Sequence, residues 1–182
     1  MKKTFFLTLA CLTAMTIFSC TPEDSDSNEK SPTETVYVDL GLPSGTLWAS
    51  QNEQNPADPE HGLYTFDEAV AAFGNRVPDY SQLMELKDVC EWEWTDGGYT
   101  VTGPNGHSIF LPAAGFRQCE DNTNAFGNDG IYGLYWSSQA YSSDPYNTSA
   151  WFMQFFFYPD GEAHVALDAY KKCRGHSVRL VQ

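Results

Sequence analysis

The chain has 182 residues and a formal net charge of -14, from 24 Asp and Glu residues against 10 Lys and Arg residues. An acidic surface without a basic stripe repels phosphate groups, which excludes nucleic acid as an expected partner and anionic membrane as a partner of the folded domain. Gly, Pro and aromatic residues are frequent, and helical periodicity is confined to two short stretches. This mixture predicts an α+β domain rich in loops.

Residues 1–19 have the parts of an export signal. A Lys-Lys pair gives the positive start, and the apolar stretch 5–18 is too short to span a bilayer as a helix. The stretch ends in Ile-Phe-Ser-Cys, which resembles the lipobox of bacterial lipoproteins. The resemblance implies cleavage before Cys20 and a lipid on Cys20. An ordinary secretory signal cut elsewhere is the alternative.

Residues 20–35 are polar and acidic, and they cannot bury enough apolar surface to fold, so we expect a flexible tether. The cluster Glu23, Asp24 and Asp26 resembles the export signals that follow the lipidated cysteine in surface lipoproteins of Bacteroidota. We therefore expect a lipid-anchored outer-membrane protein, and the cluster favours the cell surface. The lipid on Cys20 would be its contact with the membrane.

Residues 36–182 carry the patterns of one folded domain. Residues 36–40 alternate between apolar and other side chains, as in a half-buried strand. A turn follows at 42–45 and a second short strand at 46–49. Residues 51–62 form a loop, because an Asn-Pro and an Asp-Pro pair break regular structure.

Two short helices are expected next, each starting at a capping box. The boxes are Thr65–Glu68 and Asp79–Gln82, in which two side chains can each bond to the other's backbone N–H. Apolar residues recur on one face of the first helix, and Gly74 ends it as a left-handed cap. The apolar stripe of the second helix ends in Cys90, which we expect to be a buried free thiol.

Strand signals dominate the remainder of the domain. Beyond Trp94 the sequence predicts a hairpin with turns at 95–98 and 103–106, and 118–130 is a long polar loop. Three stretches are richest in aromatic and β-branched residues, and we expect them to form a small core sheet that displays loops: 132–138, 149–158 and 175–181.

Six phrases stand in order along the domain: VDLGLPSGTLWAS at 38–50, RVPDYSQLMEL at 76–86, CEW at 90–92, YTVTGPNGHSIFLPAAGFR at 99–117, GLYWSS at 133–138 and GHSVRLV at 175–181. Together they resemble the Fibrobacter succinogenes major paralogous domain family (FISUMP) as it occurs in Bacteroidota lipoproteins. The resemblance implies a C-type lectin-like fold, related to that of formylglycine-generating enzyme. In that fold two short helices flank a small, twisted, mostly antiparallel sheet with long loops and paired terminal strands.

The sequence does not indicate the ligand binding or catalysis known in related proteins. The calcium and sugar ligand set of true C-type lectins is missing, and Ser137 and Ser138 would ligate calcium poorly. No Gly-x-Ser-x-Gly motif, Walker loop or dinucleotide fingerprint is present. We expect no metal, no cofactor and no catalysis. A hydrolase using a pair of carboxylates is the minority alternative.

The domain cysteines leave two questions open. Cys119 and Cys173 could pair in an oxidising compartment, and whether they do depends on the distance between them in the fold. Cys173 and His176 have the spacing of half a zinc site, but a lone half-site is weak.

The loop Tyr141–Trp151 is the best functional candidate, because Tyr, Ser, Asn and Trp are the residues that adaptable binding loops use. The run 158–174 comes next, and its position before GHSVRLV resembles the variable region of C-type-lectin-like proteins diversified by retroelements. We expect these C-terminal loops to bind a glycan or a surface protein. Ordinary surface loops and a structural or assembly subunit are the alternatives. The expected ligand contacts are Trp136, Tyr141, Tyr146, Asn147, Trp151, Tyr158, Asp160, His164, Asp168, Tyr170 and Arg174.

Overall fold

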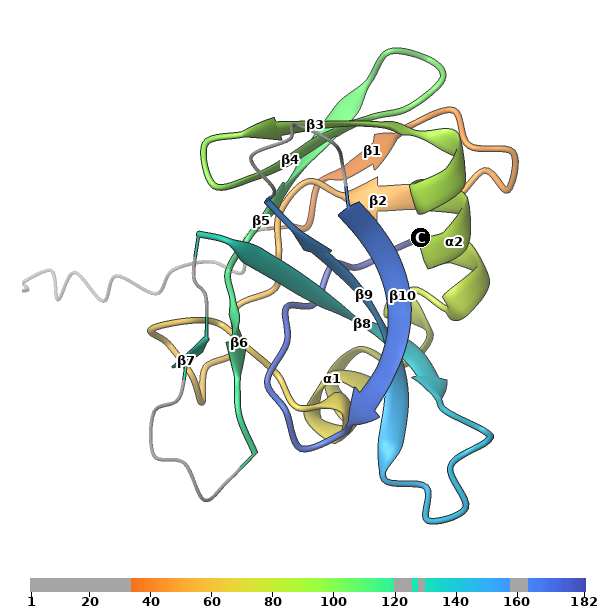
Figure 1. Cartoon of the computed structure of the whole chain (residues 1–182). Coiled ribbons are helices and arrows are strands. Elements are labelled where there is room, and N and C mark those ends of the chain that lie inside the picture. Colours follow the sequence, from red (N-terminus) through yellow and green to blue (C-terminus); the bar gives the residue numbers. More distant parts are fainter. Residues whose placement is uncertain (1–33, 120–125, 128–129, 158–163) are drawn as a thin grey trace, which may run out of the picture. The chain divides into compact units, whose positions relative to one another are not determined.

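The computed structural model in Figure 1 describes residues 34–119, 126–127, 130–157 and 164–182. These residues form an α+β domain with two short helices and small antiparallel sheets, as expected. None of the helices in the described ranges is long and apolar enough to cross a membrane. The predicted signal segment, Cys20 and the tether up to residue 33 lie outside the described residues.

The domain opens with a hairpin of β1 (Tyr37–Asp39) and β2 (Leu47–Ala49), both as predicted. The C-terminus returns to this hairpin, where Leu47 and Gln182 exchange two backbone hydrogen bonds of 2.9 and 3.0 Å. The two ends of the domain are therefore paired. Residues 175–181, predicted as a continuous strand, instead make isolated bridges to several segments.

Both helices begin at their predicted capping boxes. Helix α1 (Phe66–Phe73) begins at the box Thr65–Glu68, and α2 (Tyr80–Val89) begins at the box Asp79–Gln82. In each box both reciprocal hydrogen bonds are present, at 2.8–3.3 Å. Each box satisfies two backbone N–H groups that the helix itself leaves unpaired.

The helix C-termini differ from the prediction. Gly74 has φ 56° and ψ -124°, outside the left-handed helical region, and it opens a 3₁₀ turn, η1 (Gly74–Arg76). Cys90 is the residue at which α2 ends, so it is half-buried rather than fully buried on the helix face. It is a free thiol, as predicted, and burial raises its pKa to about 11.

A three-stranded sheet follows α2. It contains β3 (Glu91–Thr95), β4 (Gly98–Thr102) and β5 (Ser108–Pro112), in that order. Strands β4 and β5 are the predicted hairpin. Strand β3 was not predicted, although its alternation of Glu and Trp has the period of two that is typical of a strand. Beyond it, β6 (Phe116–Arg117) pairs with β7 (Phe126–Gly127).

The central sheet contains β8 (Tyr132–Ala140), β9 (Ser149–Phe156) and β10 (His164–Lys171), with β9 in the middle. The predictions of β8 and β9 are confirmed. The prediction of a binding loop at 158–174 is wrong in part. Residues 164–171 form β10, which pairs with β9 along its whole length. Its small residues and charges weaken the apolar alternation from which a strand is recognised.

Both faces of the central sheet are covered along β8. On one face Tyr135 and Phe155 join a core cluster that contains the leucines of α2 and the inner residues of β4 and β5. On the other face Trp136 and Phe152 join a cluster with α1 and the C-terminal segment. Residues 133–137 of β8 are therefore all buried, as in a strand covered on both faces.

His176 lies in the second cluster and is fully buried. Its ring stacks on Trp136 with centroids 3.9 Å apart, and the ring of Phe152 lies at 4.8 Å. Among the residues that the structure describes, neither imidazole nitrogen has a hydrogen-bond partner. Burial lowers the pKa of His176 well below its ordinary value of 6.5, and the charge of Arg174 acts in the same direction. The folded state therefore holds a neutral imidazole.

We predict that the free energy of unfolding falls as the pH is lowered from about 6.5 to 5, by up to about 1.4 kcal/mol per pH unit. The reason is that unfolded His176 takes up a proton in this range while folded His176 does not. In His176→Phe this dependence should shrink, whereas in His107→Gln, at an exposed site, it should remain. Urea unfolding at several pH values measures both. An equal pH dependence in wild type and His176→Phe would contradict the assignment.

Candidate functional site

The loop between β8 and β9, residues 141–148, is organised around one carboxylate. Asp144 Oδ1 accepts a hydrogen bond from the backbone N–H of Tyr146 at 2.9 Å. Its Oδ2 accepts from the backbone N–H and the hydroxyl of Thr148, both at 2.8 Å. These hydrogen bonds lower the pKa of Asp144 below its ordinary value, so the carboxylate stays ionised and keeps accepting.

Further hydrogen bonds fix the ends of this loop. The N–H of Tyr141 donates to the carbonyl of Ser149 at 2.9 Å, which closes the loop at its base. Asn147 has a positive φ of 50°, which asparagine tolerates better than most residues. Lys172 donates from Nζ to Asn147 Oδ1 and from its backbone N–H to the carbonyl of Thr148, both at 2.8 Å. The loop is thereby attached to the segment that follows β10.

The aromatic residues of the loop have two different roles. Tyr141 and Trp151 make an edge-to-face contact at 4.9 Å, and Tyr80 of α2 packs against Trp151 at 4.8 Å, so these rings are half-buried and support the base of the loop. Tyr146 lies at the tip and is 83% exposed. Of the predicted contacts in this loop, Tyr146 and Asn147 therefore face solvent most fully.

A shallow groove of about 630 Å³ lies beside the loop. Asn147, Lys171 and Lys172 line it together with Thr65 and Asp67 at the start of α1. The ammonium group of Lys172 also lies 5.0 Å from the centre of the Phe66 ring. The lysine pair gives this edge of an acidic chain a local positive charge.

The predicted contacts on β10 form a separate surface. Tyr170 is 46% exposed, Asp168 is exposed, and His164 stacks on Phe156 at 5.6 Å. Arg174 is less available, because its guanidinium lies between the rings of Phe116 and Tyr170, at 4.2 and 4.4 Å.

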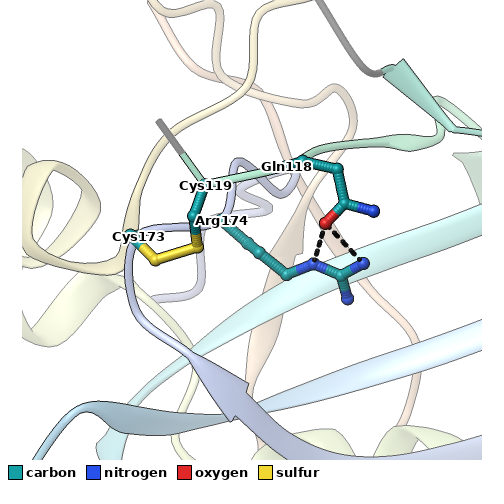
Figure 2. Close-up of a disulfide and its surroundings, with 4 residues drawn as sticks. All are labelled: Gln118, Cys119, Cys173 and Arg174. Carbon is teal, nitrogen blue, oxygen red and sulfur yellow. Dashed lines mark hydrogen bonds between the residues drawn. A yellow bond between two sulfur atoms is a disulfide. The ribbon is translucent and has the colours of Figure 1, made fainter. Parts of the chain in front are cut away.

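Figure 2 shows that Arg174 also donates from Nε and Nη2 to the side-chain oxygen of Gln118, both at 3.2 Å. Next to this contact, Cys119 and Cys173 form a disulfide with their Cα atoms 5.1 Å apart. The pairing that the sequence left open is present, and it removes Cys173 from any zinc site with His176. The bridge joins the segment after β6 to the segment after β10.

One predicted contact is wrong. Trp136 is completely buried, and its Nε1 donates to the carbonyl of Tyr64 at 2.8 Å, so it packs the core and does not meet a ligand. Aromatic residues before a loop do not reveal from sequence which face of the strand they occupy. Tyr158 and Asp160 lie outside the described residues.

A second concavity, a polar cleft of about 500 Å³, was not predicted. It is assembled from residues 50–54, 61–62, 110–114 and 177–179, which contribute its lining from four separate segments. The feature of the sequence that could have indicated this cleft is the amide-rich stretch Gln51–Asn55. That stretch alone does not show that the other three segments lie next to it in the fold. Among the described residues, no three His, Cys, Asp or Glu side chains cluster as a metal site.

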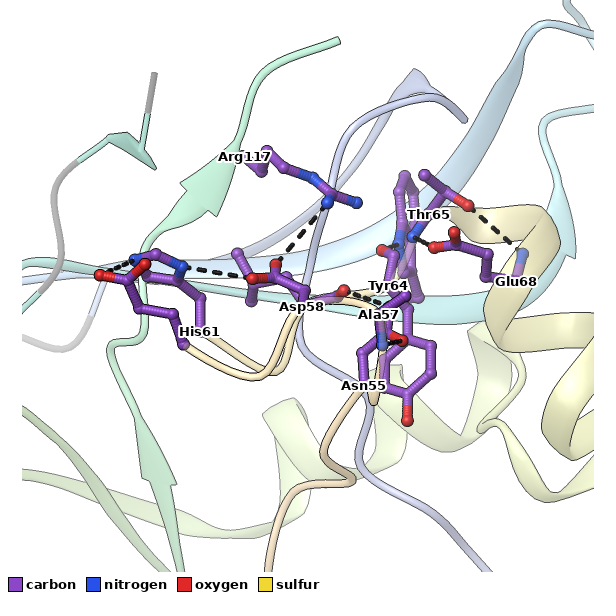
Figure 3. A network of polar contacts seen from close by, with 11 residues as sticks. Asn55, Ala57, Asp58, His61, Tyr64, Thr65, Glu68 and Arg117 are labelled. Atoms are coloured by element: carbon purple, nitrogen blue, oxygen red, sulfur yellow. Dashed lines mark hydrogen bonds and ion pairs between the residues drawn. The ribbon is translucent and has the colours of Figure 1, made fainter. Parts of the chain in front are cut away.

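Asp58 belongs to the loop that contributes His61 and Gly62 to this cleft, and Figure 3 shows its contacts. Its Oδ1 lies 3.3 Å from His61 Nδ1, and its Oδ2 lies 3.7 Å from Nη1 of Arg117 on β6. Asn55 donates from its side chain to the carbonyl of Leu63 at 2.7 Å. The contact with Arg117 attaches this loop to β6, and the hydrogen bond of 2.9 Å from the N–H of Glu53 to the carbonyl of Val178 attaches it to the C-terminal segment.

The fold and its two surfaces define a small α+β domain with a supported loop and a polar cleft. Residues 76–181 match a family model described as a domain of unknown function (DUF8237). Because the match covers more than half of the chain, the protein belongs to this family. Neither the curated proteins nor the solved structures contain a match to the chain.

We predict that changing both Cys119 and Cys173 to Ser lowers the free energy of unfolding by about 2–4 kcal/mol, because the bridge restricts the unfolded chain over 54 residues. Urea unfolding measures the loss, and Cys90→Ser is the control that removes a thiol without removing a bridge. A double variant as stable as the control would contradict the structural role of the disulfide.

Asp144→Ala should loosen the loop while leaving the core intact. We expect the amide hydrogens of Tyr146 and Thr148 to exchange with solvent at least about tenfold faster, since both lose their acceptor. Asp168→Ala is the matched control, because that carboxylate accepts from the N–H of Ala169 outside the loop. Hydrogen exchange followed by NMR measures both. Unchanged exchange in Asp144→Ala would show that other contacts hold the loop.

Proposed function

We propose that this protein is a lipid-anchored outer-membrane protein whose domain binds a partner protein at the cell surface without catalysis. The observation that carries the proposal is Tyr146, an 83% exposed aromatic ring at the tip of a loop held by Asp144 and Lys172. A large exposed ring on a fixed backbone is what a binding loop uses to enter a pocket of its partner.

The rigidity of the loop supports binding energetically. Ordering a flexible loop on binding costs conformational entropy, and a loop that is already ordered avoids most of that cost. The hydrogen bonds that Asp144 accepts, and the contact of Lys172 with Asn147, provide this order in the free domain.

The loop chemistry favours a protein over a glycan as the ligand. Sugar recognition needs several free donors and acceptors that converge in a hollow. Here Tyr146 protrudes, and both oxygens of Asp144 are occupied by the loop itself. Lys171 and Lys172 beside the groove suit a partner surface that carries carboxylates.

The finer fold assignment belongs to the same proposal. We place the domain in the C-type lectin-like fold and relate it to FISUMP, on the strength of the six phrases quoted above. The pairing of Leu47 with Gln182 and the two capped helices agree with that assignment. The lipid on Cys20 and the outer-membrane location are supported by residues 1–26 of the sequence.

Two rival functions have less support. A structural subunit that assembles by strand pairing needs an open sheet edge, but on β10 the carboxylate of Asp168 accepts from the N–H of Ala169 at 2.7 Å. Charged side chains on an edge strand oppose edge-to-edge pairing. A carboxylate-based hydrolase needs two acids in one cleft, and Glu53 is the single acidic residue among the described residues that line the polar cleft.

The test is a binding screen of the full-length chain against arrays of cell-surface proteins and of glycans. We expect a protein ligand whose affinity falls at least about tenfold in Tyr146→Ala, because an exposed anchor residue is lost. Ile131→Ala, at a 47% exposed apolar residue outside the loop, should bind as wild type does. A ligand indifferent to Tyr146→Ala would overturn the loop assignment, and a loop-dependent glycan would overturn the ligand class.

A further inference from the structure

Hydrogen bonds within the domain fix the side chains at the floor of the polar cleft. Arg179 is 2% exposed and donates to the carbonyls of Ala49 and Phe110 at 2.8 and 2.7 Å, and to Asn52 Oδ1 at 2.8 Å. The side-chain amide of Asn52 donates in turn to the hydroxyl of Tyr135 at 3.2 Å. The side chains at the floor therefore have defined orientations before any ligand arrives.

The cleft does not suit an extended peptide. Strand β5 is the edge of its sheet, and a peptide would normally pair with the outward carbonyls of such a strand. The carbonyl of Phe110 already accepts from Arg179, and that of Pro112 accepts from the Tyr135 hydroxyl at 2.8 Å. Pro112 also has no N–H to donate. Two carbonyls that would hold a peptide strand are therefore occupied, and one N–H is missing.

The lining favours a ligand without net charge. It contains one carboxylate, Glu53, whose charge acts favourably on the buried guanidinium of Arg179, so the two charges offset each other. The other polar side chains are the imidazole of His61 and several carboxamides and hydroxyls, which include Gln51, Gln54 and Ser177. Carboxamides and hydroxyls both donate and accept hydrogen bonds, which matches a ligand whose own groups are hydroxyls.

Phe110 adds an apolar surface to this polar cleft. Its ring lies against Gly98 of β4, where a Cβ atom would approach the ring to 2.7 Å, so glycine leaves the space that the ring occupies. Phe110 remains 38% exposed and is one of the residues that line the cleft. The face of an aromatic ring is electron-rich and attracts the weakly positive C–H groups on the flat side of a sugar ring.

We propose that this cleft binds a neutral saccharide, with the sugar ring against Phe110 and its hydroxyls bonded to Glu53 and the carboxamides of Gln51 and Gln54. A volume of about 500 Å³ lies within the range of small-ligand sites. The site is separate from the Tyr146 loop, since the cleft and the groove beside the loop share no lining residue. It therefore does not depend on the function proposed for the loop.

The test is an NMR titration of the full-length chain in a detergent without a sugar headgroup. The probes are glucose, galactose, mannose, N-acetylglucosamine, maltose and lactose, with glucuronate as a charged comparison and tetra-alanine as a peptide comparison. We expect at least one neutral sugar to cause saturable shifts of the amide signals of Gln51–Gln54 and Phe110, with millimolar affinity or better. Tyr146→Ala should give the same result, which separates this site from the loop.

Two variants and one control locate the sugar. Phe110→Ala should weaken binding at least about tenfold through loss of the ring. Glu53→Gln should weaken it about fivefold, through loss of a charged acceptor, while the shape of the cleft is kept. Phe157→Ala is the matched control, because that phenylalanine is 42% exposed and does not line the cleft.

Each remaining outcome decides against the proposal. Shifts with no sugar in the set, shifts with glucuronate or tetra-alanine alone, or sugar binding unchanged in both Phe110→Ala and Glu53→Gln would overturn it. If Phe110→Ala loses its dispersed spectrum, Glu53→Gln decides the matter, because the hydrogen bonds that fix the cleft floor join Arg179, Asn52 and Tyr135 and do not use the Glu53 side chain.

Discussion

The buried guanidinium of Arg179 is the contact on which the arrangement of this domain most depends. Its three hydrogen bonds reach the end of β2, the loop after it and the edge of β5. Tyr135 extends the network to the central sheet through its hydroxyl, and burial raises the pKa of that hydroxyl, so it remains a donor. Removing Arg179 would leave the buried carbonyl of Ala49 and the part-buried acceptors on Asn52 and Phe110 without this donor, which costs more than the hydrogen bonds themselves.

The C-terminal segment carries this network although it is not a regular strand. From Cys173 onward it is attached by the disulfide, by bridges of Gly175 and Ser177 to β6 and β8, and by the pairing of Gln182 with Leu47. Long-range contacts of this kind make the domain one cooperative unit. They also hold the loop groove and the polar cleft, because Cys173 lines the first and Arg179 the second.

Local signals in the sequence predicted what depends on local structure. The pairs Thr65–Glu68 and Asp79–Gln82 located both helix starts, because a capping box involves residues only three apart. The glycine-rich turn at 103–106 located the β4–β5 hairpin for the same reason.

Features that depend on distant segments were not predictable. Strand β10 exists because β9 offers it an edge, and Trp136 is buried because α1 and His176 cover its face of the sheet. The polar cleft is formed by four segments that are distant in sequence, and no short stretch of the sequence predicts that they come together. For the loop, composition indicated the right region, but only its contacts separate Tyr146 at the tip from Tyr141 and Trp151 at the base.

The central claim is that a rigid loop presents Tyr146 to a protein partner at the cell surface. The most direct measurement is photo-crosslinking on intact cells with the photoreactive residue p-benzoylphenylalanine in place of Tyr146, and in place of exposed His107 in a parallel protein. The account predicts a defined adduct with one protein from position 146 and none from position 107. The same products from both positions, or no adduct from position 146, would contradict it.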